Sequence, residues 1–498
     1  MYIINASFDA GSSSEEYYPV TKQNSVGREY ECERLDDCML SNQAQLIIIY
    51  GRKRIGKTFL INEYFDHHFA FKITGAYNQS RKVQLHSFAA ELTRKTGIKW
   101  KDPENWIQAF EDLRAYLEKS EPMEKQVVFF DEMPWLDSHR SNFLPAFEWF
   151  WNDWGSTRKN LVFIVCGSAS SWLDEKFSEN RGGLFNRQTC RLYLQPFTLH
   201  ETELFLQSKN IFWSRYEIAE CYMIMGGIPF YLNALSERYS LTQNIDRLFF
   251  QPRGEFWDEF DHLYKTLFSN SRLHLQIAEA LSAKPGGLSR QEICQCCKIS
   301  DNGALTKALH NLNSSGFIQA ARFYGKKAKD TRYRLSDHYS VFYFRFVRDI
   351  YGKDAHFWSN SIDLPTRRSW SGLAFESLCM EHIPQIKRKL GILGVLSEES
   401  VWRTRGNEET GTQGAQIDLL IDRRDRVINL CEIKFSIGEF TIDQAYDLAL
   451  RNKISVFRQE TKSRKSLQLI MITTYGLKRN MYSGLVQNQV TLDDLFQP

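Results

Sequence analysis

One eight-residue segment combines two glycines with a lysine and a threonine at the spacing that binds nucleoside triphosphates. Gly51 and Gly56 allow the backbone to curl so that successive N–H groups point at phosphate oxygens. Lys57 places a positive charge on the β- and γ-phosphates, and the Thr58 hydroxyl is a Mg²⁺ ligand. The segment follows an apolar run and opens a helical one, Lys57–Tyr64, whose N-terminus favours anions. The sequence therefore predicts that this segment binds Mg-ATP. Its residues are Gly51, Arg52, Lys53, Arg54, Ile55, Gly56, Lys57 and Thr58.

Two acidic residues at the end of another apolar run supply the second half of such a site. Gln126–Phe130 reads as a buried strand, and Asp131 and Glu132 follow it directly. We expect Asp131 to hold the metal ion through water and Glu132 to polarise the attacking water. An Asp-Glu pair after a strand is also a common helix start, but the nucleotide-binding segment upstream favours ATP hydrolysis.

A second group of ionisable residues lies near the C-terminus, on two strand-like runs, Gln416–Asp422 and Ile428–Ser436. If the runs form a hairpin centred near Asp425, residues whose numbers sum to about 850 face one another. Asp418 then lies opposite Glu432, and Lys434 shares their face. The other face is expected to pack into a core. Its residues are Ile417, Leu419, Ile421, Cys431, Ile433 and Phe435.

Two carboxylates at this separation predict a second metal site that takes Mg²⁺ or Mn²⁺. The metal would lower the pKa of a bound water, and Lys434 would orient that water or stabilise charge developing on a phosphate. The alternative is a solvated strand face with an ion pair between Glu432 and Lys434.

Strand-like and helical patterns alternate from Asn24 to Phe205, which predicts an α/β domain with a mainly parallel sheet covered by helices on both faces. The expected strands are Gln45–Tyr50, Phe69–Thr74, Gln126–Phe130, Leu161–Cys166 and Thr189–Leu194. The organisation that follows is a loose leader (1–22), a nucleotide-binding core (23–205), a helical lid (206–269), a winged helix (270–338) and a C-terminal α/β domain (339–498).

The expected winged helix consists of three short helical runs followed by a hairpin near Gly325. Its basic hairpin would lie along a DNA backbone, although winged helices also serve as protein-contact modules. The recognition helix, Asn302–Asn313, offers only Lys307 and His310 as charged or imidazole side chains for base contacts. The charged residues of the hairpin are Arg322, Lys326, Lys327, Lys329, Asp330, Arg332 and Arg334.

The composition is that of an ordinary soluble protein. A net charge of +3 excludes a chain that is basic throughout, so any nucleic-acid surface is local. Ten cysteines without a paired framework favour a reducing compartment and no structural zinc site. Without a signal peptide or a membrane-length apolar run, a cytoplasmic location is expected.

The N-terminal motifs resemble those of AAA-type ATPases, and most closely an archaeal and bacterial subgroup near the STAND regulators. Val26-Gly27-Arg28-Glu29 precedes the first strand, as in that family. The resemblance implies that Ser168 is a polar sensor of the γ-phosphate and that Arg187 is an arginine finger, acting on its own ATP or on a neighbour's in an oligomer. The segment 226–232 is similar to the family's Gly-Gly-x-Pro lid motif.

The C-terminal group resembles the PD-(D/E)xK nucleases, which cut DNA or RNA. The resemblance implies an endonuclease-like fold and a metal-dependent site of Asp418, Glu432 and Lys434. Glu376 matches an upstream helix glutamate of many members, and Gln444 matches a polar residue after the hairpin. The motif's proline is replaced by Ile417, and the tyrosine of a Gln-x-x-x-Tyr element is replaced by Leu448.

Chains that join such an ATPase to a winged helix and a nuclease-like domain form a bacterial and archaeal family of the DUF234 type, which this sequence resembles over nearly its whole length. Three functions follow as alternatives. The first is an ATPase that controls a C-terminal DNase. The second is an ATP-driven switch that cuts nothing. The third is a remodelling ATPase whose C-terminal domain only grips nucleic acid.

Overall fold

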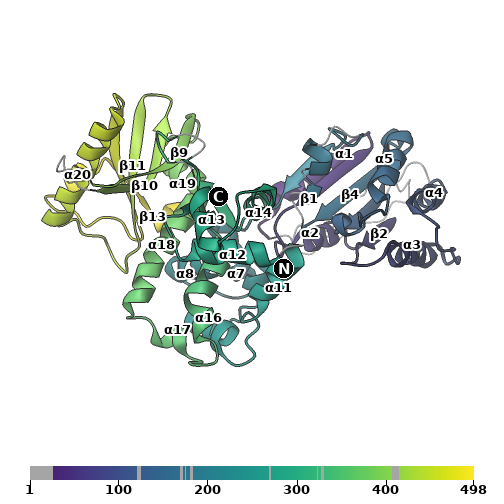
Figure 1. Cartoon of the computed structure of the whole chain (residues 1–498), viewed down its shortest axis with the longest axis horizontal. Coiled ribbons are helices and arrows are strands. Elements are labelled where there is room, and N and C mark those ends of the chain that lie inside the picture. Colours follow the sequence, from purple (N-terminus) through teal and green to yellow (C-terminus); the bar gives the residue numbers. More distant parts are fainter. Residues whose placement is uncertain are drawn as a thin grey trace, which may run out of the picture.

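A computed structural model describes residues 26–119, 125–168, 172–173, 175–179, 183–268, 271–321, 323–326, 330–406 and 414–498. The expected leader and the hairpin residues Arg322, Lys327 and Lys329 lie outside these ranges. Two five-stranded sheets lie at opposite ends of the molecule, with a helical region between them (Figure 1).

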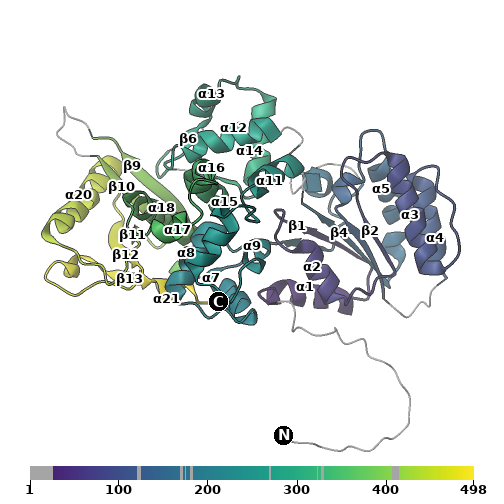
Figure 2. The ribbon, with the colours of Figure 1, turned by 90° about the horizontal axis from the view of Figure 1, so that it is seen from below.

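The N-terminal sheet is parallel, with the strand order β2-β3-β4-β1-β5. Alternate residues of each strand enter two cores, because helices cover both faces. Ile47 and Ile49 pack on the α1 and α2 side, and Leu46 and Ile48 on the α3, α4 and α5 side (Figure 2). The strands are β1 (Gln45–Tyr50), β2 (Phe71–Thr74), β3 (Gln126–Asp131), β4 (Leu161–Gly167) and β5 (Cys190–Tyr193). The helices are α1 (Glu29–Leu40), α2 (Lys57–Tyr64), α3 (Arg81–Thr96), α4 (Trp106–Leu117) and α5 (Phe143–Asp153), with short turns η2 (Met133–Trp135), η3 (Gly155–Thr157) and η4 (Glu175–Glu179).

The middle of the chain is helical. Its first elements are α7 (Leu199–Ser208), α8 (Arg215–Met225), α9 (Pro229–Asn233), α10 (Leu241–Ile245), η5 (Asp246–Phe250) and α11 (Glu259–Leu267). Three further helices and a small sheet follow: α12 (Ser271–Ser282), β6 (Leu288–Ser289), α13 (Arg290–Cys297), α14 (Gly303–Ser314), β7 (Ile318–Ala321) and β8 (Arg332–Leu335). The lead-in to the second sheet contains α15 (His338–Phe342), η7 (Tyr343–Val347), α16 (Arg348–Ile350) and α17 (Phe357–Asn360).

The C-terminal sheet is mixed, with the order β13-β12-β11-β10-β9, and lies between two long helices. Leu419 and Cys431 belong to the core on the α18 side, whereas Leu420 and Leu430 belong to the core on the α20 side. The strands are β9 (Ser397–Thr404), β10 (Ala415–Arg423), β11 (Val427–Lys434), β12 (Ser466–Thr473) and β13 (Asn488–Thr491). The helices are α18 (Pro365–Glu381), α19 (Ile383–Lys389), α20 (Gln444–Thr461), η8 (Ser483–Leu485) and α21 (Leu492–Leu495).

One prediction about this sheet is wrong. Ile417 was expected to share a face with Leu419, but it packs in the α20-side core beside Leu420. The register against β9 shifts between Ile417 and Leu420, which marks a β-bulge at Asp418 and Leu419. A bulge adds one residue to a strand, and this reverses the alternation of its side chains. The other five residues expected in the core lie in or against the α18-side core, as predicted.

The β7–β8 hairpin does not project freely into solvent. Phe323 pairs with Val401 of β9, and the Tyr324 N–H donates to the Val401 carbonyl at 2.9 Å. The Tyr324 ring lies 5.4 Å from the ring of Phe457 on α20. The hairpin is therefore docked on the edge of the C-terminal sheet.

The α18-side core is continuous with the core beneath α1 and α2 through the middle helices, so the three regions are not separately packed. In the part of the chain that the structure covers, no helix is both long and apolar enough to cross a bilayer.

Candidate functional site

The segment from Gly51 to Thr58 forms a tight loop between β1 and α2. Gly51 has φ +153°, and a Cβ placed there would lie 2.5 Å from the Leu194 carbonyl oxygen. Gly56 has φ +90°, in the left-handed region that other residues rarely adopt. Both glycines are therefore required by the backbone, the first also by close approach to the neighbouring chain.

Lys57, Thr58 and Asp131 converge at the mouth of this loop. The Lys57 ammonium is buried and donates to the Gly51 and Arg52 carbonyls, at 3.0 Å each. The Thr58 hydroxyl lies 3.0 Å from each carboxylate oxygen of Asp131, at the end of β3. Burial and the neighbouring Glu132 charge raise the pKa of Asp131. A hydroxyl and a carboxylate side by side match the oxygen ligands that Mg²⁺ prefers.

Glu132 follows Asp131 in the left-handed conformation, with φ +47°. This turn directs its carboxylate to the end of β4, where it accepts hydrogen bonds from the Ser168 hydroxyl and from the Ser168 N–H at 3.1 Å. The residue predicted to polarise water and the residue predicted to sense the γ-phosphate are therefore in direct contact.

The arginines inside the loop form long-range ion pairs. Arg52 donates to Asp337 at 2.6 Å, and Arg54 makes two 2.9 Å hydrogen bonds to Glu259. Both pairs join the loop to residues more than 200 positions downstream. The Nε and Nη2 atoms of Arg52 are buried and find no hydrogen-bond partner among the described residues, although the guanidinium lies 4.9 Å from the Phe317 ring centroid. Arg52 and Arg54, which occupy positions that the phosphate-binding motif leaves open, thus tie the loop to the middle helices by ion pairs.

Arg28, from the motif ahead of the first strand, holds the loop by hydrogen bonds to backbone carbonyls. It is buried and donates to the Ile55 carbonyl at 3.2 Å and to the Gln195 carbonyl at 3.0 Å. Arg187 differs, because its side chain is exposed and has no hydrogen bond or ion pair within the described part of the chain. Its role as an arginine finger stays a prediction.

The C-terminal hairpin has the predicted register. Leu419 faces Cys431 and Ile421 faces Asn429, pairs whose numbers sum to 850. The ladder ends before Asp418, whose carboxylate accepts a 3.0 Å hydrogen bond from the Ile433 N–H. The bulge thus turns Asp418 toward β11, close to Glu432 and Lys434.

Glu432 is only 1% exposed and has its own partners on α20. Lys453 donates to both of its carboxylate oxygens, at 2.8 and 2.6 Å, and Tyr446 donates at 3.3 Å. Lys434 lies 5.5 Å from the Tyr446 ring centroid. The sequence reasoning missed Tyr446 and Lys453. Their seven-residue spacing, which places them on one helical face, was the available signal.

Glu376 approaches the same hairpin from α18. Burial, and then the Asp418 charge, raise the pKa of Glu376 to about 7. Glu376 and Asp418 share a hollow of about 80 Å³ with Arg334 of β8 and Arg403 of β9. Glu432 does not line this hollow. The structure therefore brings together Glu376 and Asp418, with two arginines that the sequence reasoning did not place there.

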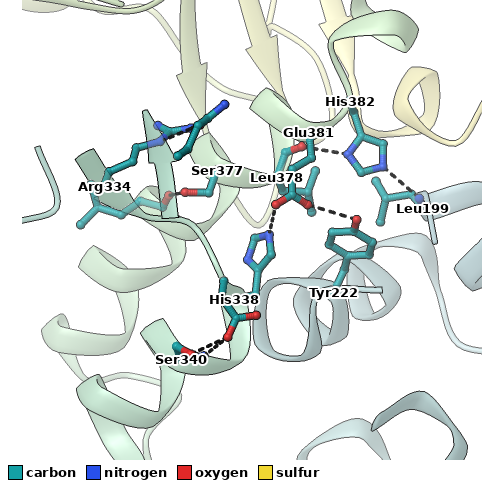
Figure 3. A network of polar contacts seen from close by, with 12 residues as sticks. Leu199, Tyr222, Arg334, His338, Ser340, Ser377, Leu378, Glu381 and His382 are labelled. Carbon is teal, nitrogen blue, oxygen red and sulfur yellow. Dashed lines mark hydrogen bonds and ion pairs between the residues drawn. The ribbon is translucent and has the colours of Figure 1, made fainter. Parts of the chain in front are cut away.

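A polar network centred on Glu381 lies between the two sites, and Figure 3 shows the contacts of Glu381 with His338 and Tyr222. Asp337, which binds Arg52, is followed by His338, whose Nε2 lies 3.3 Å from a carboxylate oxygen of Glu381. The Tyr222 hydroxyl donates to the other oxygen at 3.1 Å. Although burial opposes it, the Glu381 charge raises the pKa of His338 overall. Glu381 is the last residue of α18, the helix that carries Glu376.

Comparison with known proteins identifies the N-terminal part. Residues 26–235 match the family described as an ATPase domain predominantly from Archaea. These residues are an archaeal-type ATPase domain with the P-loop fold. An uncharacterized protein of Methanocaldococcus jannaschii is 27% identical over 328 residues, 65% of this chain and 68% of that protein. An uncharacterized ATP-binding protein of the same organism is 46% identical over 41 residues, 8% of this chain and 70% of that protein.

Among solved structures, the Walker-type ATPase of Pyrococcus abyssi superposes with a TM-score of 0.46 at 17% identity, covering 66% of this chain and 99% of that one. The ORC2 protein of Aeropyrum pernix gives a TM-score of 0.42 at 16% identity, covering 68% and 96%. The family match ends at residue 235, within the middle helices, so the region from α10 onward lies beyond it.

Proposed function

We propose that the protein hydrolyses Mg-ATP and that its nucleotide state controls a metal-dependent nuclease-like site in the C-terminal domain, which acts on DNA. The observation that carries the first half is the convergence of Lys57, Thr58 and Asp131 beside Glu132. This arrangement supports a site in which one cation neutralises phosphate charge and two oxygen ligands hold a metal ion.

Each residue of the ATPase site has a distinct task. Lys57 binds the β- and γ-phosphates, and Thr58 and Asp131 hold Mg²⁺, which neutralises phosphate charge when bound. Glu132 orients the attacking water and accepts its proton. The hydrogen bonds from Ser168 hold the Glu132 carboxylate in place, so Ser168 acts here as a positioning residue and sensor.

The proposed control has a physical route. A change at the phosphate loop moves Arg52, whose ion-pair partner Asp337 precedes His338. His338 contacts Glu381 at the C-terminal end of α18, and Glu376 lies about one and a half helical turns back along the same helix. A shift of α18 would thus change the position of Glu376 relative to Asp418.

The nuclease-like site rests on the hairpin geometry. Asp418 and Glu376 supply carboxylates to one hollow, and oxygen ligands of this kind suit Mg²⁺ or Mn²⁺. Such a metal would supply activated water at neutral pH. Lys434, at the end of β11, would stabilise charge on the cleaved phosphate.

One observation favours the alternative of an ATP-driven switch that cuts nothing. Glu432 is buried, and both of its carboxylate oxygens accept hydrogen bonds from Lys453. The charge of this predicted metal ligand is therefore already neutralised by a cation of the chain itself. In this second function the C-terminal domain binds DNA or a protein without cleaving it.

The ATPase assignment is tested by steady-state turnover of the purified full chain. We expect Lys57→Ala and Glu132→Gln each to lower kcat at least about 100-fold, because each removes a group required for binding or water activation. Lys99→Ala, an exposed lysine of the same domain, is the matched control and should keep wild-type turnover. Full turnover in Lys57→Ala would overturn the assignment.

The nuclease half is tested on plasmid and linear DNA in Mg²⁺ and Mn²⁺, with and without ATP. We expect cleavage that depends on nucleotide and that Asp418→Ala and Lys434→Ala abolish. Asp425→Ala, at the hairpin turn, should cleave normally. If no combination of metal and nucleotide yields cleavage, the switch replaces the nuclease.

A further inference from the structure

One lysine of α20 is bonded to a carboxylate that the sequence predicts as a metal ligand. The predicted site joins Asp418 and Glu432, and Lys453 donates to both carboxylate oxygens of Glu432, at 2.8 and 2.6 Å. An ammonium group has three N–H donors, so it can hold two oxygens at once, as a hard divalent cation does, but with a single positive charge. Both oxygens of Glu432 are therefore engaged by the protein itself.

The motif lysine, Lys434, does not form this ion pair. Its ammonium lies 5.5 Å from the ring centroid of Tyr446, and no carboxylate of the described residues is within ion-pair distance of it. The Tyr446 hydroxyl in turn donates to Glu432 at 3.3 Å. Lys453, and not Lys434, is thus the cation that is bonded to Glu432.

The position of Lys453 on α20 directs it at the sheet but leaves it room to withdraw. It lies between Leu450 and Phe457, which are buried in the α20-side core, and residues three or four positions apart share one helix face. The Lys453 side chain is 24% exposed, whereas that of Glu432 is 1% exposed. A change of rotamer can therefore move the ammonium into solvent while α20 stays packed, but Glu432 remains in the interior.

Asp418, the second carboxylate of the predicted pair, is held differently. One of its oxygens accepts a 3.0 Å hydrogen bond from the N–H of Ile433, the residue after Glu432, and the other has only a long 3.5 Å contact with the Gln416 amide. Asp418 therefore keeps an oxygen that a metal ion can reach. Since divalent cations need several oxygen ligands, the engagement of Glu432 by Lys453 lowers the affinity of the pair for metal.

We propose that Lys453 controls metal binding at the C-terminal site, because its ammonium keeps Glu432 from serving as a metal ligand. Glu432 joins Asp418 in binding a divalent cation only when Lys453 withdraws. The inference rests on the metal-dependent site of the proposed function and deepens it by naming the residue that sets its metal affinity. It adds a regulatory residue from α20 to a site predicted from the hairpin alone.

The test measures Mn²⁺ binding to the full chain without nucleotide or DNA, from the electron paramagnetic resonance signal of the free ion. We expect Lys453→Met to bind Mn²⁺ at the C-terminal site at least about tenfold more tightly than the wild type, because a buried carboxylate without its cation attracts a divalent ion strongly. Glu432→Gln/Lys453→Met lacks that carboxylate and should show no gain. Any ion held at the phosphate loop is common to all three proteins and cancels in the comparison.

Two matched variants separate the role of Lys453 from the loss of any lysine. Lys453→Arg keeps the positive charge and should bind Mn²⁺ as the wild type does. Lys465 forms a comparable ion pair with Asp422 elsewhere on the same hairpin, and Lys465→Met should also bind Mn²⁺ as the wild type does. An equal gain in either variant, or no gain in a folded Lys453→Met, would overturn the proposal.

Thermal melting keeps the test decisive if Lys453→Met is unfolded without metal. A ligand that binds only the folded state stabilises that state, so Mn²⁺ should then restore a cooperative unfolding transition. If the variant folds without metal, Mn²⁺ should raise its melting temperature more than that of the wild type. A variant that stays unfolded in Mn²⁺ would also overturn the proposal.

These outcomes are distinct from the fate of the nuclease proposal. If Lys453→Met gains Mn²⁺ but the wild type cleaves DNA under no condition, the control by Lys453 stands and the nuclease falls. If the wild type cleaves DNA but Lys453→Met gains no Mn²⁺, the nuclease stands and Lys453 has only a structural role.

Discussion

At the scale of single residues, the burial of Glu432 makes the fold depend on Lys453, which supplies the positive charge that the buried carboxylate needs. A carboxylate that is 1% exposed depends on its cationic partner, since an unpaired buried charge is strongly destabilising. We expect Lys453→Met to lower the free energy of unfolding by about 3 kcal/mol at pH 8, measured by urea denaturation. The loss should shrink at pH 5, because the unpaired Glu432 would then take up a proton. Lys453→Arg keeps the charge and should lose less than about 1 kcal/mol, whereas equal losses in both variants would contradict the ion-pair explanation.

Glu376 makes stability depend on pH in a definite direction. Its native pKa of about 7 lies above the ordinary value of 4.5, so the native state binds the proton more tightly than the unfolded chain. Between pH 4.5 and 7 this group therefore makes the protein less stable as pH rises. Glu376→Gln cannot titrate, so its stability relative to wild type should increase across this window in urea denaturation at each pH. A constant difference would show that the Glu376 pKa is not raised.

At the scale of elements, the docking of the β7–β8 hairpin rests on few contacts. The Tyr324 ring against Phe457 is one of them, and such ring pairs contribute about 0.5–1.5 kcal/mol beyond their buried area. We expect Tyr324→Ala to speed tryptic cleavage at Lys326, because the hairpin would leave the edge of β9. Phe212→Ala, an aromatic residue that is 76% exposed, should keep the wild-type cleavage rate. Unchanged cleavage in Tyr324→Ala would mean that the ring does not hold the hairpin.

The elements that the sequence predicted well are those whose hydrophobic pattern or turn depends only on neighbouring residues of the chain. Gln45–Tyr50 contains an apolar run, Leu46–Ile49, that is buried on both faces, and its strand bounds agree with the structure. The hairpin register followed from a short turn between two alternating runs. In contrast, β9 has no regular alternation of buried and exposed residues, so nothing in its sequence marked it as a strand.

The parts of the candidate sites that were missed depend on distant contacts. The bulge at Asp418 arises from pairing with β9, a strand that was itself not expected. Lys453 reaches Glu432 only because α20 packs across the hairpin. Arg52 fitted the phosphate-binding pattern as a variable position, and no local pattern relates it to Asp337. Tertiary packing, which periodicity does not encode, decided each of these contacts.

At the scale of the whole molecule, the Arg52–Asp337 pair should transmit nucleotide binding to α18. We expect a non-hydrolysable ATP analogue to slow amide hydrogen exchange near Glu381 in the wild type. Asp337→Asn removes the charge that holds Arg52 and should abolish this effect while the loop still binds the analogue. Asp363→Asn, at a side chain that is 94% exposed, is the matched control and should behave as wild type. If Asp337→Asn keeps the slowed exchange, the signal does not pass through this pair.

The large sequence separation between Arg52 and its partner Asp337 also has a consequence for the chain during translation. Arg52 and Asp337 are 285 residues apart, and a ribosome adds about 5–20 residues per second. The phosphate loop thus emerges roughly 14–57 s before the residue that completes its surroundings. During that interval Arg52 lacks its Asp337 partner, so the nascent chain should acquire its mature affinity for nucleotide only after Asp337, about two thirds of the way along the chain, has been added.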